Sequence, residues 1–180
     1  MRSTTALPAA LALLGPAAIV LADQPPGGAA GPADERYCRV EIQTRADVEA
    51  GKVAEPVCFD TFAKLLSSLG VAPGVAVADS PAAMAAESWP SNALAAHYEG
   101  LGGSGSYIVV VGNDCTGGGL NLSPDWNDRI RSTRHLRCGT IKHWRDWGLQ
   151  GPAETTSGSY GTIRNLTTLD QQVTSIQYYA

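Results

Sequence analysis

The sequence predicts a mainly β protein, with two strand-rich units in its second half and a small β-hairpin and helix ahead of them. From about residue 95 onward, short apolar stretches are separated by turn residues at short intervals, which is typical of a β sandwich or barrel. No long helix fits this region. The segment at residues 126–132 nearly recurs 43 positions later, at 169–175, and this repetition implies two similar units of about forty residues.

Composition limits both the size and the class of the protein. The chain has 180 residues, of which 44% are hydrophobic and 17% are charged, so it can bury a core despite its 20 Gly and 11 Pro. Its length suits one ordinary domain with a small appendage. The net charge of −4 argues against nucleic-acid binding by neutralisation of phosphates, which needs a basic excess. We therefore expect a folded protein with no nucleic-acid partner.

The first residues predict a targeting signal. Residues 1–22 combine Arg2 with a broken apolar run and small residues at Val20 and Ala22, a pattern typical of a secretory signal peptide. A membrane anchor is disfavoured because about 20 unbroken apolar residues are needed to span a bilayer. We expect cleavage after Ala22, a secreted product without a membrane span, and a flexible Pro/Gly/Ala-rich leader at residues 23–35.

A hairpin is expected next. Apolar and polar residues alternate at 37–44 and, more weakly, at 52–59, which predicts two strands folded back near Val48. This register places Cys38 opposite Cys58. Because secreted proteins form disulfides readily, the two cysteines should be bonded, which would stabilise the unit by roughly 3 kcal/mol.

A helix follows the hairpin. Asp60 is a suitable N-cap, and Gly70 a suitable end, for a helix with an apolar stripe. It completes a hairpin and helix unit at residues 36–70. Residues 71–93 are rich in Ala, Pro and Ser and are expected to form a connector, with a short helix possible at 80–87.

The remaining residues, 94–180, are expected to form one β domain. Cys115 and Cys138 both lie in it and should form the second disulfide. Strands are expected at residues 95–99, 106–111, 119–122, 129–136, 140–144, 160–166 and 172–178.

A spacing of aromatic and glycine residues in this domain resembles a known family. From Trp144 to Gly151, an aromatic residue is followed by charged residues, an apolar residue and a glycine. This is similar to the folded first hairpin of a βγ-crystallin Greek key. Tyr98 to Gly105 keeps the spacing but lacks the apolar residue. The resemblance covers roughly residues 95–180 and implies a two-motif Greek-key sandwich.

The paired segments extend this resemblance to a metal site. Residues 127–132 and 170–175 resemble the calcium motif N/D-N/D-x-x-S/T-S of microbial βγ-crystallins. In that family, a site takes the carbonyl of the third position, the hydroxyl of the fifth, and the second side chain of the other motif. The resemblance therefore implies a site made of the Gln172 carbonyl, the Thr174 hydroxyl and the Asp128 carboxylate, all oxygen ligands of the kind calcium prefers.

The second site implied by the resemblance is expected to be disabled. It would use the Arg129 carbonyl with the side chains of residues 131 and 171, but these are Arg131 and Gln171. A guanidinium repels a divalent ion, and the amide contributes no charge. We expect one calcium ion at most, bound in the weak range of about 10⁻⁴ to 10⁻³ M. The alternative is that both segments only form turns, since Asn and Asp bond their own backbone without a metal.

No catalytic constellation accompanies these motifs. His97, His135 and His143 are too far apart in sequence for a short zinc motif, and no nucleophile elbow occurs. The sequence thus predicts a secreted, non-enzymatic calcium-binding module. Because proteins similar to this family also include protease inhibitors and killer-toxin-like proteins, the alternative is action on a secreted protease or cell-surface component, with residues 112–119 as the exposed loop.

Overall fold

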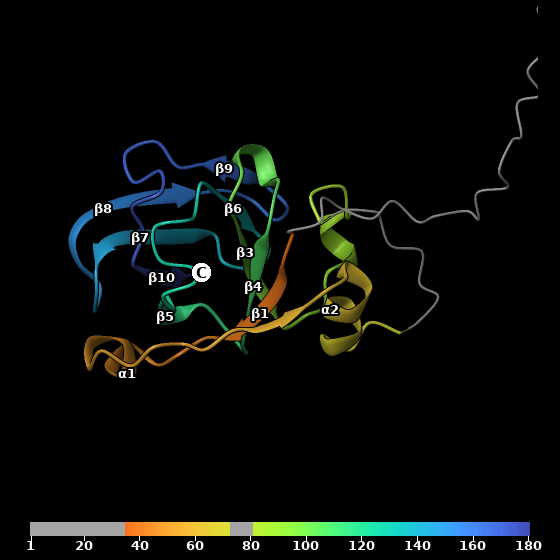
Figure 1. Ribbon diagram of the computed structural model, residues 1–180, viewed down its shortest axis with the longest axis horizontal. Helices are drawn as coiled ribbons and strands as arrows, with labels where there is room; N and C mark the ends of the chain where they lie inside the picture. Colours follow the sequence, from red (N-terminus) through yellow and green to blue (C-terminus); the bar gives the residue numbers. More distant parts are fainter. Residues whose placement is uncertain (1–34, 73–80) are drawn as a thin grey trace, which may run out of the picture. The chain divides into compact units, whose positions relative to one another are not determined.

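The computed structural model describes residues 35–72 and 81–180. The expected signal peptide at 1–22, the leader up to residue 34 and residues 73–80 of the connector lie outside the described residues. Within them, a six-stranded and a four-stranded sheet are accompanied by few helices (Figure 1). The prediction of a mainly β sandwich is confirmed.

The elements are listed here in chain order. The strands are β1 (Tyr37–Glu41), β2 (Val57–Phe59), β3 (Ala93–Tyr98), β4 (Tyr107–Val111), β5 (Thr116–Asn121), β6 (Ser132–His135), β7 (Thr140–Asp146), β8 (Gln150–Ser157), β9 (Ile163–Asn165) and β10 (Ser175–Tyr179). The helices are α1 (Arg45–Glu49) and α2 (Phe62–Ser68), with 3₁₀ turns η1 (Ala86–Ser88) and η2 (Leu101–Gly103).

Each of the two sheets contains strands from both repeated units. One sheet has the order β2-β1-β4-β3-β6-β9, and the other has the order β5-β10-β7-β8. Strands β3 to β6 make one unit of four, and β7 to β10 make the next. In each unit the third strand, β5 or β9, leaves its own unit and pairs with the last strand of the other. Neither sheet is therefore complete without both units.

The N-terminal hairpin belongs to the larger sheet. Strand β1 pairs in parallel with β4, from Tyr37 opposite Tyr107 to Glu41 opposite Val111. The predicted register of the hairpin is confirmed, because Cys38 lies opposite Cys58 and the two form a disulfide. The hairpin unit thus extends the sandwich by two strands.

The connection between the two strands of this hairpin contains a helix that was not predicted from the sequence. Helix α1 occupies it, and the Thr44 hydroxyl caps the helix by accepting a hydrogen bond from the Asp47 main-chain N. The second strand begins only at Val57. Helix α2 also begins one residue late, because Thr61 rather than Asp60 is its N-cap and accepts from the Lys64 main-chain N.

Two apolar cores follow from this arrangement. One lies between the sheets, and the other lies between the six-stranded sheet and α2 (Figure 1). Strand β4 is buried along its whole length because both of its faces are covered, which accounts for its continuous apolar sequence.

The second predicted disulfide, Cys115–Cys138, is also present and lies in the core between the sheets. Two disulfides indicate an oxidising compartment.

Among the described residues, no helix has the length and apolar character needed to cross a membrane.

The core between the sheets contains a chain of polar side chains. His97 lies 2.8 Å from the Thr133 hydroxyl through Nδ1 and 2.8 Å from the Tyr178 hydroxyl through Nε2. The Thr133 hydroxyl also lies 2.9 Å from His143 Nε2. All four side chains are fully buried. Burial lowers the pKa of His97 well below its ordinary value and that of His143 to about 4, so both histidines are neutral at pH 7.

Candidate functional site

The two similar segments form turns that lie side by side and bond to each other. The Asp128 main-chain N donates to the Val173 carbonyl at 3.0 Å, and the Gln171 main-chain N donates to the Ile130 carbonyl at 3.0 Å. Asp128 and Gln171 hold the same position in their segments and share the left-handed φ of 56°. The predicted pairing of the two segments is therefore present, with a local two-fold relation between them.

The last residue of each segment fastens the turn to a hairpin. The Ser132 hydroxyl donates to the Gly100 carbonyl at 2.6 Å, and the Ser175 hydroxyl donates to the Asp146 carbonyl at 2.6 Å. Each serine oxygen also accepts from a main-chain N of the same hairpin, Gly103 in one unit and Leu149 in the other. Ser132 and Ser175 therefore make the same pair of hydrogen bonds in the two units.

The expected ligand groups occupy these neighbouring turns, and no basic side chain among the described residues forms an ion pair with Asp128. The only hydrogen bond to the Asp128 carboxylate in the described part of the chain comes from the adjacent Asn127 amide, at 2.9 Å. The Gln172 carbonyl and the Thr174 hydroxyl have no hydrogen-bond donor among the residues at 35–72 and 81–180. Asp128 and Gln172 are exposed, and Thr174 is buried. The three groups are oxygen ligands of the kind that a hard cation prefers.

In the second expected site, Arg131 holds the motif position that Thr174 holds in the first, so a guanidinium lies where a hydroxyl ligand is needed. Arg131 donates through Nε and a terminal nitrogen to the two carboxylate oxygens of Asp170, at 3.0 and 2.9 Å. Bidentate pairs of this kind are among the stronger ion pairs. The hydrogen bond from Arg131 lowers the pKa of the Asp170 carboxyl. The guanidinium thus neutralises the acid beside the second expected site.

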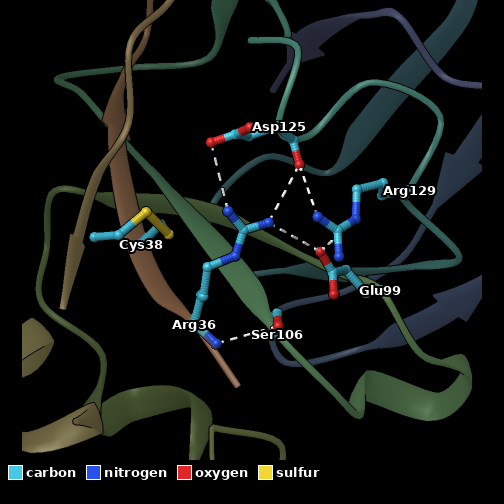
Figure 2. Close-up of a disulfide and its surroundings, with 7 residues drawn as sticks. Arg36, Cys38, Glu99, Ser106, Asp125 and Arg129 are labelled. Carbon is cyan, nitrogen blue, oxygen red and sulfur yellow. Dashed lines mark hydrogen bonds and ion pairs between the residues drawn. A yellow bond between two sulfur atoms is a disulfide. The ribbon is translucent and has the colours of Figure 1, made fainter. Parts of the chain in front are cut away.

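The first turn is tied to the N-terminal strand by an ion network (Figure 2). The guanidinium groups of Arg36 and Arg129 both donate to the Asp125 carbonyl, at 3.3 and 3.1 Å, and both approach the Glu99 carboxylate. Arg36 also lies over the ring of the buried Trp126, with its guanidinium carbon 5.7 Å from the ring centroid. The residue that precedes β1 therefore holds the entry to the first turn.

The second turn is held by a carboxylate from β8. Glu154 accepts hydrogen bonds from the main-chain N of Thr167, Thr168 and Leu169, at 2.8 to 3.2 Å. Burial raises its pKa, but these hydrogen bonds outweigh burial and leave the pKa below its ordinary value. Neither Glu154 nor Arg36 was predicted from sequence, because each acts on a turn far away along the chain.

The donor set suits a weak cation site rather than a strong one. The described residues hold no group of three or more His, Cys, Asp or Glu side chains that could bind a metal. The expected ligands include only one carboxylate, from Asp128. Calcium affinity falls as the number of charged ligands falls.

The predicted inhibitor loop at 112–119 has exposed residues on both sides of a buried, disulfide-bonded cysteine. Asn113, Asp114 and Thr116 are exposed, while Cys115 is buried and bonded to Cys138.

In comparisons with protein-family models, curated proteins and solved structures, nothing matched this chain.

Proposed function

We propose that this protein is a secreted, non-enzymatic Greek-key protein of the βγ-crystallin type that binds one calcium ion between its paired turns. The observation that carries the proposal is the reciprocal hydrogen bonding of Asp128 with Val173 and of Gln171 with Ile130. This bonding puts the Asp128 carboxylate in the turn beside the one that contains Gln172 and Thr174. Calcium at this point links the two Greek-key units.

The stabilising effect of such an ion follows from linkage. An ion that binds only the folded chain adds about 1.4 kcal/mol to the unfolding free energy at ten times its dissociation constant. For a domain of this size that corresponds to a rise in melting temperature of about 3 to 6 °C. The role of the ion is thus to stabilise the paired turns.

A non-enzymatic role is supported by the histidines. All three histidines of the chain are buried. His97 and His143 lie between the sheets, and His135 Nδ1 bonds the Cys138 carbonyl at 2.9 Å. None of them can contact a substrate in the folded state. Secretion is supported by the two disulfides and by the signal-like residues 1–22.

Calorimetry on one substitution tests the calcium proposal. Asp128→Gly removes the ligand side chain altogether and suits the left-handed backbone at this position. Wild type should melt about 3 to 6 °C higher at saturating calcium than in chelator, and Asp128→Gly should lose that rise. Asp125→Asn, in the same loop but outside the motif, should keep it. Absence of any rise for wild type at about 10 mM calcium, ten times the upper end of the weak range, contradicts the proposal.

A second candidate function is inhibition of a secreted protease through residues 112–119. The observation that favours it is the exposed tip at Asn113 and Asp114 beside the buried disulfide of Cys115, since rigid loops lose little entropy on binding. Assays against secreted metalloproteases and serine proteases test it. A calcium module without this activity should leave every protease unaffected.

A further inference from the structure

A groove separate from the paired turns lies beside the loop at 113–118. Its volume is about 540 Å³, and it is lined by the segment 42–45, which leads into α1, by the loop 113–118, and by Gln177 and Tyr179 of β10. Sites for small molecules have volumes of about 300 to 1,000 Å³. No residue of the two turn motifs lines the groove. It is therefore a candidate site independent of calcium.

The walls of the groove are fixed by the fold. Gln43 and Gly119 exchange both of their main-chain hydrogen bonds, at 2.9 and 3.0 Å. The Ile42 main-chain N donates to the Val111 carbonyl at 2.8 Å. On the opposite wall, the disulfide of Cys115 holds the loop. A ligand would thus meet a preformed surface and lose little free energy in ordering it.

The lining combines one aromatic ring with many polar groups. Tyr179 is 36% exposed and is the only aromatic residue of the lining. Asp114 uses one carboxylate oxygen to accept from the Thr116 main-chain N at 3.1 Å and from its hydroxyl, and its other oxygen has no partner in the described residues. Arg45 donates through Nε to Glu49 at 2.7 Å, which leaves both terminal nitrogens without a bond to any described residue. The Asn113 amide is also unbonded within residues 35–72 and 81–180.

These groups disfavour two other classes of ligand. An added β-strand needs a row of free main-chain groups, but Gly119 already bonds Gln43, and the Gly117 carbonyl accepts from the Gln177 amide at 3.2 Å. A strongly charged ligand is disfavoured because the lining has one cation, Arg45, and one anion, Asp114. The remaining chemistry is that of a neutral molecule with many hydroxyl groups and an apolar face.

We propose that this groove binds a neutral saccharide, with a sugar ring stacked on Tyr179. The Asp114 carboxylate accepts hydrogen bonds from sugar hydroxyls, the Asn113 amide both donates and accepts, and the terminal nitrogens of Arg45 donate to hydroxyl pairs. The ring of Tyr179 supplies the apolar contact for the face of the sugar. Tyrosine suits this role because its ring is apolar while its hydroxyl remains able to form hydrogen bonds.

The test is titration of the full chain with five soluble trisaccharides, built from glucose in β- and α-linkage, N-acetylglucosamine, xylose and mannose. Calorimetry in the presence of chelator should give a dissociation constant below about 1 mM, or −4 kcal/mol, for at least one of them. In amide NMR spectra, the same trisaccharide should shift Gly117 and Gly118 and leave the paired turns unchanged. Failure of all five to bind at ten times that concentration overturns the proposal and leaves the calcium proposal intact.

Substitutions locate the binding. Tyr179→Ala should weaken the affinity at least tenfold, whereas Tyr179→Phe should stay within about threefold because the ring face remains. Tyr160→Ala is the matched control, since Tyr160 is an exposed tyrosine, 47% accessible, that does not line the groove. If Tyr179→Ala fails to fold, Asn113→Ala and Asp114→Asn replace it, each with an expected loss of at least fivefold. Wild-type affinity in these variants, or loss of affinity in Tyr160→Ala, overturns the assignment.

Discussion

Asp128 and Gln171 have equivalent backbone conformations but different side chains. A left-handed conformation is unfavourable by about 1 kcal/mol for most residues and less so for Asn and Asp. Asp128 suits its φ of 56°, whereas Gln171 has no such preference. The strain is therefore concentrated in the second turn.

Relief of this strain gives a prediction at a single residue. Gln171→Asn should raise the unfolding free energy by about 0.5 to 1 kcal/mol, because Asn tolerates a positive φ better than Gln. Urea unfolding in chelator measures this change without any contribution from calcium. Gln172→Asn, at the next position and without a positive φ, should give no gain, and an equal gain there would contradict the explanation.

Arg131 provides a second prediction at this scale. In Arg131→Ser, the pKa of the Asp170 carboxyl should rise toward its ordinary value of about 3.9, because the hydrogen bond from Arg131 lowers it. NMR titration of the carboxyl carbon measures the shift. Under the proposed function, adding Gln171→Asp to this variant should supply the missing carboxylate, and the double variant should bind two calcium ions in place of one by calorimetry. Arg145→Ser, which removes an exposed arginine paired with Asp146, should change neither quantity.

At the scale of the elements, Glu154 shows that an exposed edge strand can hold a turn in another part of the chain. Its carboxylate accepts from three consecutive main-chain N–H groups at 167–169. Glu154→Gln should lower the unfolding free energy by about 1 to 2 kcal/mol at pH 7, because hydrogen bonds to a charged acceptor are the stronger ones. Glu55→Gln, at an exposed position, should have almost no effect.

The pH dependence distinguishes this explanation from simple loss of packing. The folded pKa of Glu154 is lowered, so its contribution is complete above the unfolded pKa of about 4.3 and disappears as the pH falls through the folded value. The difference between wild type and Glu154→Gln should therefore shrink at low pH. A difference that stays constant from pH 7 to pH 3 would contradict the assigned role.

Several elements could be predicted from local patterns, and others could not. The hairpin register and Cys38–Cys58 follow from alternation, and the predicted strands at 106–111 and 140–144 correspond to β4 and β7. Strand β8 was missed because Gly151 and Pro152 interrupt it and its exposed edge position needs no apolar alternation. Helix α1 could have been found, since Thr44 and Asp47 form a capping pair.

On the scale of the whole molecule, the polar chain between the sheets links stability to pH. His97 and His143 connect β3, β6, β7 and β10 through Thr133 and Tyr178. Both histidines have a lowered pKa in the folded state, whereas the unfolded value is about 6.5. Their contribution to stability is therefore complete above about pH 6.5 and is lost as the pH falls toward 4.

Acid unfolding tests this linkage. The unfolding free energy should fall by on the order of 3 kcal/mol between pH 7 and pH 4 from His143 alone, given its folded pKa of about 4. Glu154, His135 and His97 are the titratable groups that interact with His143. In His143→Gln, the slope of stability between pH 6.5 and pH 4 should decrease. An unchanged slope would show that other groups dominate acid unfolding.

The sequence by itself determined the local features of this protein. Alternation and turn residues specified a mainly β fold, the repeated segments specified two similar units, and cysteine positions specified both disulfides. These features depend on residues close together in the chain or on a simple repeat. Tertiary structure alone decided the parallel pairing of β1 with β4, the exchange of β5 and β9, and the groove beside residues 113–118. Each of these brings together segments far apart in sequence, and such contacts are selected by the packing of the whole core, which no local pattern encodes.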